Sequence, residues 1–356
     1  MTLRHLRVDG LRCLSGQSLD LHERCNYLWG PNGSGKTSCL EAIYLLGRGR
    51  SFRTRQTARL LQRGCERLTV FGVSQDEDGQ SHHLGVEFAD GRLESRLDGE
   101  PVAGQAEMVR ALPVFVIDPR LHQLVEAGPT ERRRYLDNGV FHVEQGFLAD
   151  WRQYRRVLGQ RNAALKARVP DRELVPWTEP MAAAGQRVHE ARAAYVGELA
   201  SRVSGLGRAL LGVDIQIGYR AGWRQGLSLA EALEESRSRD RVSGFTQVGP
   251  HRADLQLDFE SGGVRETASR GQQKLVAAAL VLAQVGLFEA RTGRRSTLLL
   301  DDASAELDGG AQLRLGEALD GLTSQQILTG LSLESLQPES GFPVFHVEQG
   351  RIRSML

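Results

Sequence analysis

The sequence predicts an α/β protein in which a mixed sheet surrounds a nucleotide-binding helix and a mainly helical lobe is inserted into the chain. Three observations lead to this fold class. Residues 30–37 read Gly-Pro-Asn-Gly-Ser-Gly-Lys-Thr, the phosphate-binding pattern G-x-x-x-x-G-K-T, between a strand-like and a helix-like stretch. Strand periodicity surrounds this loop, and helical periodicity replaces it from about Leu121 to Ser238. A wholly apolar stretch, Thr297–Leu300, then ends in two aspartates.

The amino-terminal part is predicted to be rich in strands. Apolar and polar residues alternate in short stretches separated by polar turns, namely 3–11, 19–21, 68–73, 84–88 and 93–97. Cys25–Trp29 is predicted to be a buried strand that enters the glycine loop. The helix after the loop is predicted over Lys36–Leu46, with one apolar stripe and an end at Gly47.

The glycine loop and its flanks predict binding of ATP or GTP with Mg²⁺. Its glycines let backbone N–H groups point at phosphate oxygens, at the positive end of the following helix. Lys36 is predicted to reach the β- and γ-phosphates, and the Thr37 hydroxyl to bind Mg²⁺. The nucleotide-binding residues predicted here are Gly30, Pro31, Asn32, Gly33, Ser34, Gly35, Lys36, Thr37 and Ser38.

The two aspartates after Thr297–Leu300 are predicted to complete the catalytic site with Lys36. A phosphate loop requires a carboxylate at the tip of a buried strand. Asp301 is predicted to support Mg²⁺, and Asp302 to polarise the water that attacks the γ-phosphate. Because an aspartate base reaches one methylene less far than a glutamate, we predict slow hydrolysis, with kcat below about 10 s⁻¹.

A second candidate anion site is Ser269-Arg270-Gly271-Gln272, at the start of an apolar helix predicted over residues 271–291. A serine hydroxyl, free N–H groups and the helix dipole together suit a γ-phosphate. Since the chain already has its own phosphate loop, we predict that Ser269, Gly271 and Gln272 serve the nucleotide of a second copy, which makes an ATP-dependent homodimer. The alternative is a simple helix cap by Ser269.

The region between the two halves of the site is predicted to be a helical lobe. Three domain segments follow: residues 1–112 with the phosphate loop, residues 113–244 as the helical lobe, and residues 245–356 with the serine–glycine segment and the aspartates. We expect the helices of the lobe to be interrupted at Pro170, Pro176 and Pro180.

Composition is that of an ordinary globular protein. The net charge is +1, so any preference for a polyanion must come from local patches. The four cysteines, Cys13, Cys25, Cys39 and Cys65, show no metal-ligand spacing and predict reduced, buried thiols. The longest apolar run is too short to span a bilayer, and the amino terminus lacks the apolar core of a secretory signal. We expect a cytoplasmic protein without a membrane partner.

Taken in order, these motifs resemble the ABC-type ATPases, and more narrowly the RecF family of bacterial recombination and gap-repair ATPases. The matching segments are G-P-N-G-S-G-K-T at 30–37, G-R-S-F-R at 49–53, R-R-R-Y-L-D at 132–137, Q-R-N-A-A-L at 160–165, G-P-H-R-A-D-L at 249–255, S-R-G-Q-Q-K at 269–274, L-L-L-D-D at 298–302 and E-L-D at 306–308. Two departures lie near the expected dimer seam: Ala268 replaces the usual leucine of the signature segment, and Ala305 replaces a common serine.

The resemblance implies a function in DNA repair and replication. It implies an ATP-binding head related to those of structural maintenance of chromosomes proteins, with weak, DNA-stimulated ATP hydrolysis that acts as a conformational switch. It also implies partnership with RecO and RecR, help in loading RecA onto gapped DNA, and a role in the SOS response. Arg12, in the turn after the first strand, is expected to reach the nucleotide by the same resemblance.

Arginine-rich segments are the candidate DNA contacts. Residues 48–67, here called the basic segment, hold seven arginines and one acidic residue. With the resemblance, the favoured contacts are Arg48, Arg50, Arg53, Arg132, Arg133 and Arg134. Few aromatic residues accompany them, so we expect recognition of the duplex backbone, including gapped and junction DNA, with little sequence preference.

Three other functions share part of this pattern. A transporter ATPase subunit would need a more compact chain between Lys36 and Asp301, and a chromosome-structural ATPase would need sustained heptads. A small-molecule kinase would leave the segment at Ser269 unexplained. His82, His83 and His251 have no ligand partners at metal-site spacing, and surface or structural roles are favoured.

Overall fold

The computed structural model describes residues 1–102, 104–302 and 307–355, and it divides into two compact units. Unit 1 contains Met1–Leu121 and Phe288–Leu356, and unit 2 contains His122–Leu287. The division differs from the predicted segments, because residues 245–287 pack with the helical lobe. Arg132 of the lobe pairs with Asp254, and the Tyr135 hydroxyl donates to the carbonyl oxygen of Leu280.

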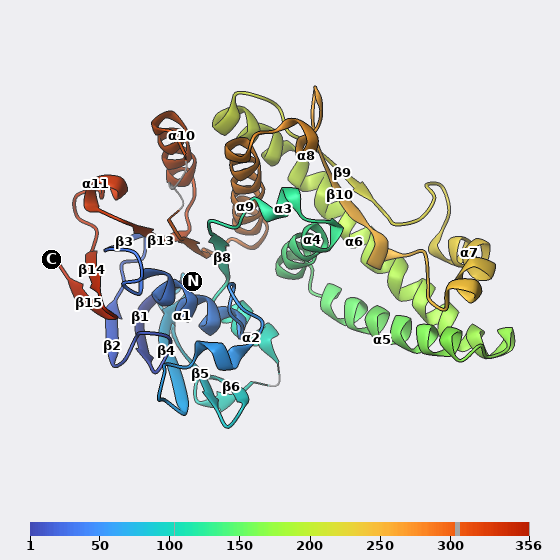
Figure 1. The fold of residues 1–356 in the computed structure, drawn as a ribbon, viewed down its shortest axis with the longest axis horizontal. Helices are drawn as coiled ribbons and strands as arrows, with labels where there is room; N and C mark the ends of the chain where they lie inside the picture. Colours follow the sequence, from blue (N-terminus) through green and yellow to red (C-terminus); the bar gives the residue numbers. More distant parts are fainter. Residues whose placement is uncertain (103, 303–306, 356) are drawn as a thin grey trace. The chain divides into compact units, whose positions relative to one another are not determined.

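Unit 1 contains two sheets, both visible in Figure 1. The first is antiparallel, with the strand order β2-β1-β4-β5-β6-β7. Its strands are β1 Thr2–Asp9, β2 Gln17–Asp20, β4 Arg67–Gln75, β5 Ser81–Ala89, β6 Arg92–Leu97 and β7 Glu100–Pro101. The predicted alternation is confirmed in β1 and β5, whose large apolar residues are buried. In β4, Leu68 and Val70 are buried, but Phe71 is 37% exposed.

The second sheet of unit 1 positions the site. Its order is β15-β14-β3-β13-β12-β8, and only β15 runs antiparallel to its neighbour. The strands are β3 Cys25–Trp29, β8 Val114–Ile117, β12 Thr297–Leu300, β13 Gln325–Gly330, β14 Val344–Glu348 and β15 Arg351–Ser354. Parallel strands end at one edge of a sheet, so the glycine loop after β3 and the aspartates after β12 meet there, with the end of β13 between them.

Helix α1, Lys36–Arg48, contributes to one core with both sheets. Leu40 and Ile43 are buried with residues of the antiparallel sheet and with Leu299 and Ile327 of the parallel sheet. The helix passes the predicted end at Gly47 and stops at Gly49, whose φ of 59° is left-handed. Gly47 is required for another reason: a Cβ there would lie 2.6 Å from the carbonyl oxygen of Leu112.

The other helices of unit 1 are short. They are η1 Thr57–Leu60, α2 Gln105–Ala111, α10 Gly309–Asp320 and α11 Leu333–Leu336. All four cysteines are free thiols, but only Cys39 is fully buried, and Cys13 and Cys65 are exposed. The expectation of buried thiols was therefore wrong for these two, which lie in turns.

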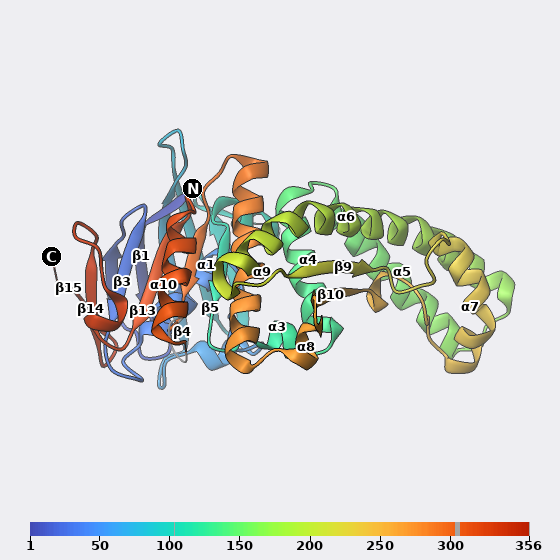
Figure 2. The same ribbon diagram turned by 90° about the horizontal axis from the view of Figure 1, so that it is seen from above.

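Unit 2 is mainly helical, with a three-stranded sheet of order β11-β10-β9. Its elements are α3 Gln123–Glu126, α4 Pro129–Val143, α5 Phe147–Lys166, α6 Asp171–Leu211, β9 Gln216–Arg220, α7 Leu229–Ser243, η2 Pro250–Arg252, β10 Asp254–Phe259, β11 Gly262–Gly263, α8 Val264–Thr267 and α9 Arg270–Thr292, whose last residues belong to unit 1. Figure 2 shows α6 as one long helix.

Helix α6 corrects one prediction. Pro170 precedes the helix, as expected, but Pro176 and Pro180 lie inside it without ending it. Each proline removes one backbone donor, yet Leu174 and Met181 on either side are buried. Packing on both sides of the prolines therefore outweighs the local preference.

Helix α9 is long and apolar enough to cross a membrane, but 72% of its most apolar window is buried inside the protein. Burial of this extent is typical of a core helix. Its length and hydropathy are therefore weak evidence for a span.

Candidate nucleotide site

The glycine loop contains backbone positions that only glycine fits well. Gly35 has φ of 119°, a region that residues with a Cβ rarely adopt, and it is the N-cap of α1. Gly30 needs the absence of a side chain, because a Cβ there would lie 2.1 Å from the carbonyl oxygen of Val347. The turn between β14 and β15 also holds the loop, since the Gly350 N–H donates to the Ser34 carbonyl oxygen at 2.7 Å.

Lys36 is the first residue of α1, directly after the glycine loop. Its ammonium group is largely buried and donates to the carbonyl oxygens of Gly30, at 2.7 Å, and Pro31, at 3.2 Å. In the described part of the chain, no side chain caps the amino end of α1. A lysine cation and uncapped N–H groups at the positive end of a helix dipole form an anion site.

The two aspartates lie beside Thr37, as the strand order predicts. Asp301 Oδ1 accepts a hydrogen bond from the Thr37 hydroxyl at 2.9 Å and another from the Thr329 hydroxyl at 3.1 Å. Burial raises the pKa of Asp301, and the neighbouring carboxylates of Asp302 and Asp118 raise it further. A cation bound beside Asp301 would be favoured, because the three acidic side chains lie close together.

Asp302 is held in a strained conformation by Thr329. Its φ is 45°, and its N–H donates to the Thr329 hydroxyl oxygen at 2.9 Å. Among the described residues, Asp302 Oδ1 and the Ser34 hydroxyl are buried without a hydrogen-bond partner. Buried polar atoms of this kind are costly unless a ligand or solvent pairs with them, so the donor set fits a nucleotide with Mg²⁺.

Sequence reasoning missed Thr329 and Glu41. Thr329 is the last but one residue of β13 and contacts both aspartates through one hydroxyl. Glu41 is fully buried in α1, and both of its oxygens accept from Arg12, from Nε at 3.0 Å and from Nη2 at 3.1 Å. A single acidic residue on an otherwise apolar helix stripe was the available signal for Glu41.

Arg12 lies in a turn that packs against the glycine loop. A Cβ at Gly35 would lie 3.0 Å from the Cys13 sulfur, and Cys13 Sγ is 3.9 Å from the Ser38 hydroxyl oxygen. Arg12 itself has φ of 57°. The expectation that Arg12 reaches the nucleotide stays a prediction, with its place beside the loop in support.

The serine–glycine segment begins helix α9 in unit 2. The Gln272 N–H donates to the Ser269 hydroxyl at 3.3 Å, and the Gln272 side-chain oxygen accepts from the Ser269 N–H at 2.9 Å. These reciprocal bonds are a capping box, so the helix cap considered from sequence is present. Ser269 and Gln272 are exposed, and Gly271 is half-buried. A role toward a second nucleotide stays a prediction, and Ala305 and Glu306 lie outside the described residues.

The predicted DNA contacts divide by burial. Arg50, Arg53 and Arg134 are exposed, and Arg134 pairs with Glu131. Arg133 is half-buried and donates to the Ala253 carbonyl oxygen at 2.8 Å.

Two of the predicted contacts are buried. Arg48 is buried at the end of α1. Arg132 is buried and donates to both oxygens of Asp254, at 2.8 and 3.0 Å. Burial makes both guanidinium groups less accessible to a DNA backbone than those of the exposed arginines, and their contact with DNA stays a prediction.

The histidines have structural neighbours. Nδ1 of His82, on β5, lies 3.1 Å from Oδ2 of Asp98, and Nδ1 of His251 lies 2.6 Å from the Tyr154 hydroxyl. Burial lowers the pKa of His251 to about 4. Within the described ranges, no group of three or more His, Cys, Asp or Glu residues is placed to hold a metal ion.

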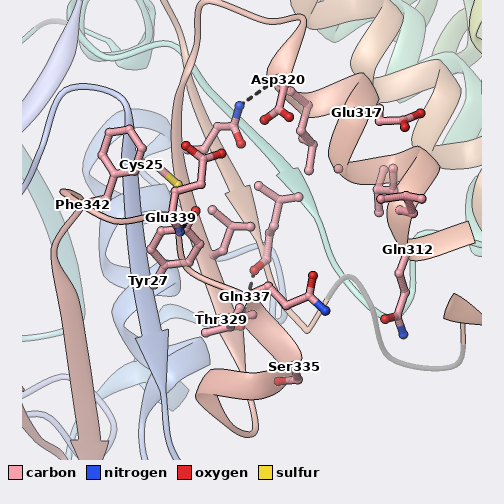
Figure 3. A pocket seen from close by; sticks show the side chains of 18 of the residues that line it. Cys25, Tyr27, Gln312, Glu317, Asp320, Thr329, Ser335, Gln337, Glu339 and Phe342 are labelled. Atoms are coloured by element: carbon pink, nitrogen blue, oxygen red, sulfur yellow. Dashed lines mark hydrogen bonds between the residues drawn. The ribbon is translucent and has the colours of Figure 1, made fainter. Parts of the chain in front are cut away.

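A cavity of about 520 Å³ lies in unit 1 among β3, β13, α10 and α11 (Figure 3). Cys25, Tyr27 and Glu339 line it on one side and Gln312 and Glu317 on the other. Burial raises the pKa of the Cys25 thiol to about 11, so this cysteine is protonated at neutral pH. Cys25 is therefore not an activated thiol, and none of the glycine-loop residues lines the cavity.

Comparisons with known proteins identify relatives over the full length. Residues 2–352 match the family model described as RecF/RecN/SMC N terminal domain. The chain is 39% identical to the DNA replication and repair protein RecF of Thioalkalivibrio sulfidiphilus over 358 residues, 99% of each chain. It is 40% identical to the protein of the same name in Stenotrophomonas maltophilia over 364 residues, again 99% of each.

Solved structures agree with these relatives. A structure described as the recombination mediator protein RecF with ATP, in the RecFOR pathway, superimposes with a TM-score of 0.89 at 26% identity, covering 100% of this chain and 98% of that one. An Smc head bound to a winged-helix domain of ScpA has a TM-score of 0.61 at 15% identity, covering 100% and 98%, which shows the ABC-type head fold alone.

Proposed function

Because the chain belongs to the RecF family, we propose that it is an ATP-dependent DNA-binding protein of recombinational gap repair and replication. The observation that carries this proposal is the meeting of Thr37 and Asp301, at 2.9 Å, beside the buried Lys36. Relatives named RecF, one of them solved with ATP, support the same nucleotide. The transporter alternative is not favoured by relatives of this name at 35–40% identity over 99% of the chain.

Each residue of the site has a proposed role. Lys36 and the first amides of α1 bind the phosphates, and Thr37 and Asp301 would hold Mg²⁺, which supplies charge neutralisation on the phosphates. Asp302, fixed by Thr329, orients the attacking water. We propose weak, DNA-stimulated hydrolysis that resets a conformational switch.

We propose that ATP closes a homodimer in which Ser269, Gly271 and Gln272 of one copy meet the nucleotide of the other. The cap of α9 supports this role, because Ser269 and Gln272 are exposed. The Ser269 hydroxyl accepts from the Gln272 N–H and keeps its own hydrogen to donate to a phosphate of a second copy. The exposed arginines of the basic segment, with Arg134, would then contact duplex backbone near a gap. RecO, RecR and RecA are the proposed partners, and the cytoplasm the proposed location.

The test is DNA binding by the whole chain with ATP, with ADP and without nucleotide, alongside Lys36→Met. We expect tight binding to gapped duplex only for the wild type with ATP, and a salt-dependent affinity. Light scattering on the same samples should show dimers only in that condition. Unchanged DNA affinity across all four samples, or monomers throughout, would refute ATP-gated binding.

A further inference from the structure

Glu41 is a fully buried carboxylate that the nucleotide site does not use directly. An isolated buried charge is costly, so a carboxylate in this position must be paired. Arg12 pairs with it through Nε and Nη2. This edge-on geometry leaves Nη1 of Arg12 without a hydrogen-bond partner in the described part of the chain, and the side chain is 28% exposed. Glu41 thus holds a cation in a fixed orientation beside the glycine loop.

The same carboxylate also holds the start of the basic segment. The Ser51 hydroxyl donates to Glu41 Oε1, the oxygen that also accepts from Arg12 Nη2. Ser51 in turn accepts from the N–H groups of Arg53, at 2.9 Å, and Thr54, at 3.0 Å. The conformation of the exposed Arg53 is therefore tied through two hydrogen bonds to a buried charge.

Arg12 contacts the far end of the same segment through its backbone. The Arg12 N–H donates to the Leu60 carbonyl oxygen at 2.7 Å, and the Gln62 N–H donates to the Gly10 carbonyl oxygen at 2.8 Å. The turn beside the glycine loop therefore binds residues 60–62, while Glu41 binds Ser51. Arg53, Arg55 and Arg59 lie between these two anchors and are exposed.

We propose that Glu41 is a positioning residue that links Arg12 at the nucleotide site to the basic segment, so that nucleotide binding sets the conformation of the arginines between Ser51 and Leu60. A phosphate that binds Nη1 of Arg12 displaces the guanidinium group. The Glu41 side chain then either moves with it or loses its hydrogen bonds to Arg12. Because Ser51 shares the same oxygen, the segment moves with it. The expected consequence of this link, a change in affinity for DNA, rests on the proposed function.

The test is hydrogen exchange of the whole chain with and without Mg-ATP, read at the amides of Arg53 and Thr54. We expect Mg-ATP to change their exchange rates by about threefold or more in the wild type. In Glu41→Gln and Ser51→Ala this response should fall below about 1.5-fold. Ser51→Ala should bind a fluorescent ATP analogue within about twofold of the wild type, because Ser51 donates to Glu41 and not to the glycine loop.

Asp240→Asn is the matched control, since Asp240 is likewise fully buried and pairs with an arginine, Arg161, in unit 2. It should keep the response at Arg53 and Thr54. A wild type without any response to Mg-ATP, or a Glu41→Gln variant that keeps it, would overturn the link. If Glu41→Gln fails to fold, the exchange response of Ser51→Ala tests the link, because Ser51 is only half-buried and its replacement is better tolerated. An exchange response that depends on Glu41, with DNA affinity indifferent to nucleotide, leaves the link standing and refutes the proposed ATP gating instead.

Discussion

Replacing Thr329 by valine tests whether one hydroxyl organises both aspartates. Thr329 is 1% exposed, donates to Asp301 and accepts from the Asp302 N–H. Valine has nearly the same shape, so the change opens no cavity. It removes a hydrogen bond to the Asp301 carboxyl group and leaves the part-buried N–H of Asp302 unpaired. Together these losses should lower the free energy of unfolding by about 2–4 kcal/mol.

The same substitution should slow ATP hydrolysis much more than it weakens nucleotide binding. Asp302 keeps its φ of 45° only while its N–H is anchored, and a shift of its carboxylate should lower kcat by about 10- to 100-fold. Lys36 and the glycine loop are untouched, so affinity for a fluorescent ATP analogue should change by less than about threefold.

Urea unfolding, phosphate release and titration with the analogue measure the three quantities. Thr329→Ser keeps the hydroxyl and should stay close to the wild type in all of them. A valine variant that hydrolyses ATP at the wild-type rate, or a serine variant as impaired as valine, would show that the hydroxyl does not position Asp302.

The remaining predictions concern charge and burial. Because the pKa of Asp301 is raised in the folded state, the wild type loses stability as pH rises from the unfolded-state pKa, about 4, to the folded-state pKa. The melting temperature of Asp301→Asn should therefore exceed that of the wild type at pH 7 and equal it at about pH 3. Because the pKa of His251 is lowered to about 4, stability should fall by about 3 kcal/mol as pH drops from 6.5 to about 4, a loss that urea unfolding should not find in His251→Gln. Arg132→Ala should destabilise unit 2 by about 2–4 kcal/mol without changing the salt dependence of DNA affinity. Arg53→Ala should leave stability unchanged and reduce by about 1 the slope of log DNA affinity against log salt concentration. If Arg132→Ala changed that slope and Arg53→Ala did not, burial would not distinguish DNA-binding arginines from structural ones.

Local pattern was enough for most elements of unit 1. The apolar run of β12 lies between polar residues, and its predicted limits, Thr297 and Leu300, are those of the strand. The glycine loop was equally visible, because its function depends on consecutive residues. Pro176 and Pro180 misled because their effect is local, whereas the packing that carries α6 past them involves distant helices.

The supporting residues of the site could not be found in this way. Thr329 and Asp301 are brought together by strand pairing, and Arg12 and Glu41 by a turn packed on a helix. Arg132 and Arg134 belong to one run of arginines, yet one is buried against Asp254 and the other is exposed. Which face of a helix is covered depends on tertiary contacts that the arginine count does not contain.

The contact between Gly350 and the Ser34 carbonyl also has a consequence for biosynthesis. The hairpin β14–β15 that supports the glycine loop follows it far along the chain, so on the ribosome the loop emerges well before the hairpin. A nascent chain should therefore be unable to retain ATP until this hairpin has left the exit tunnel. A message with a premature stop before Val344 should yield a product that never captures nucleotide, and so never competes with the full-length protein for DNA gaps.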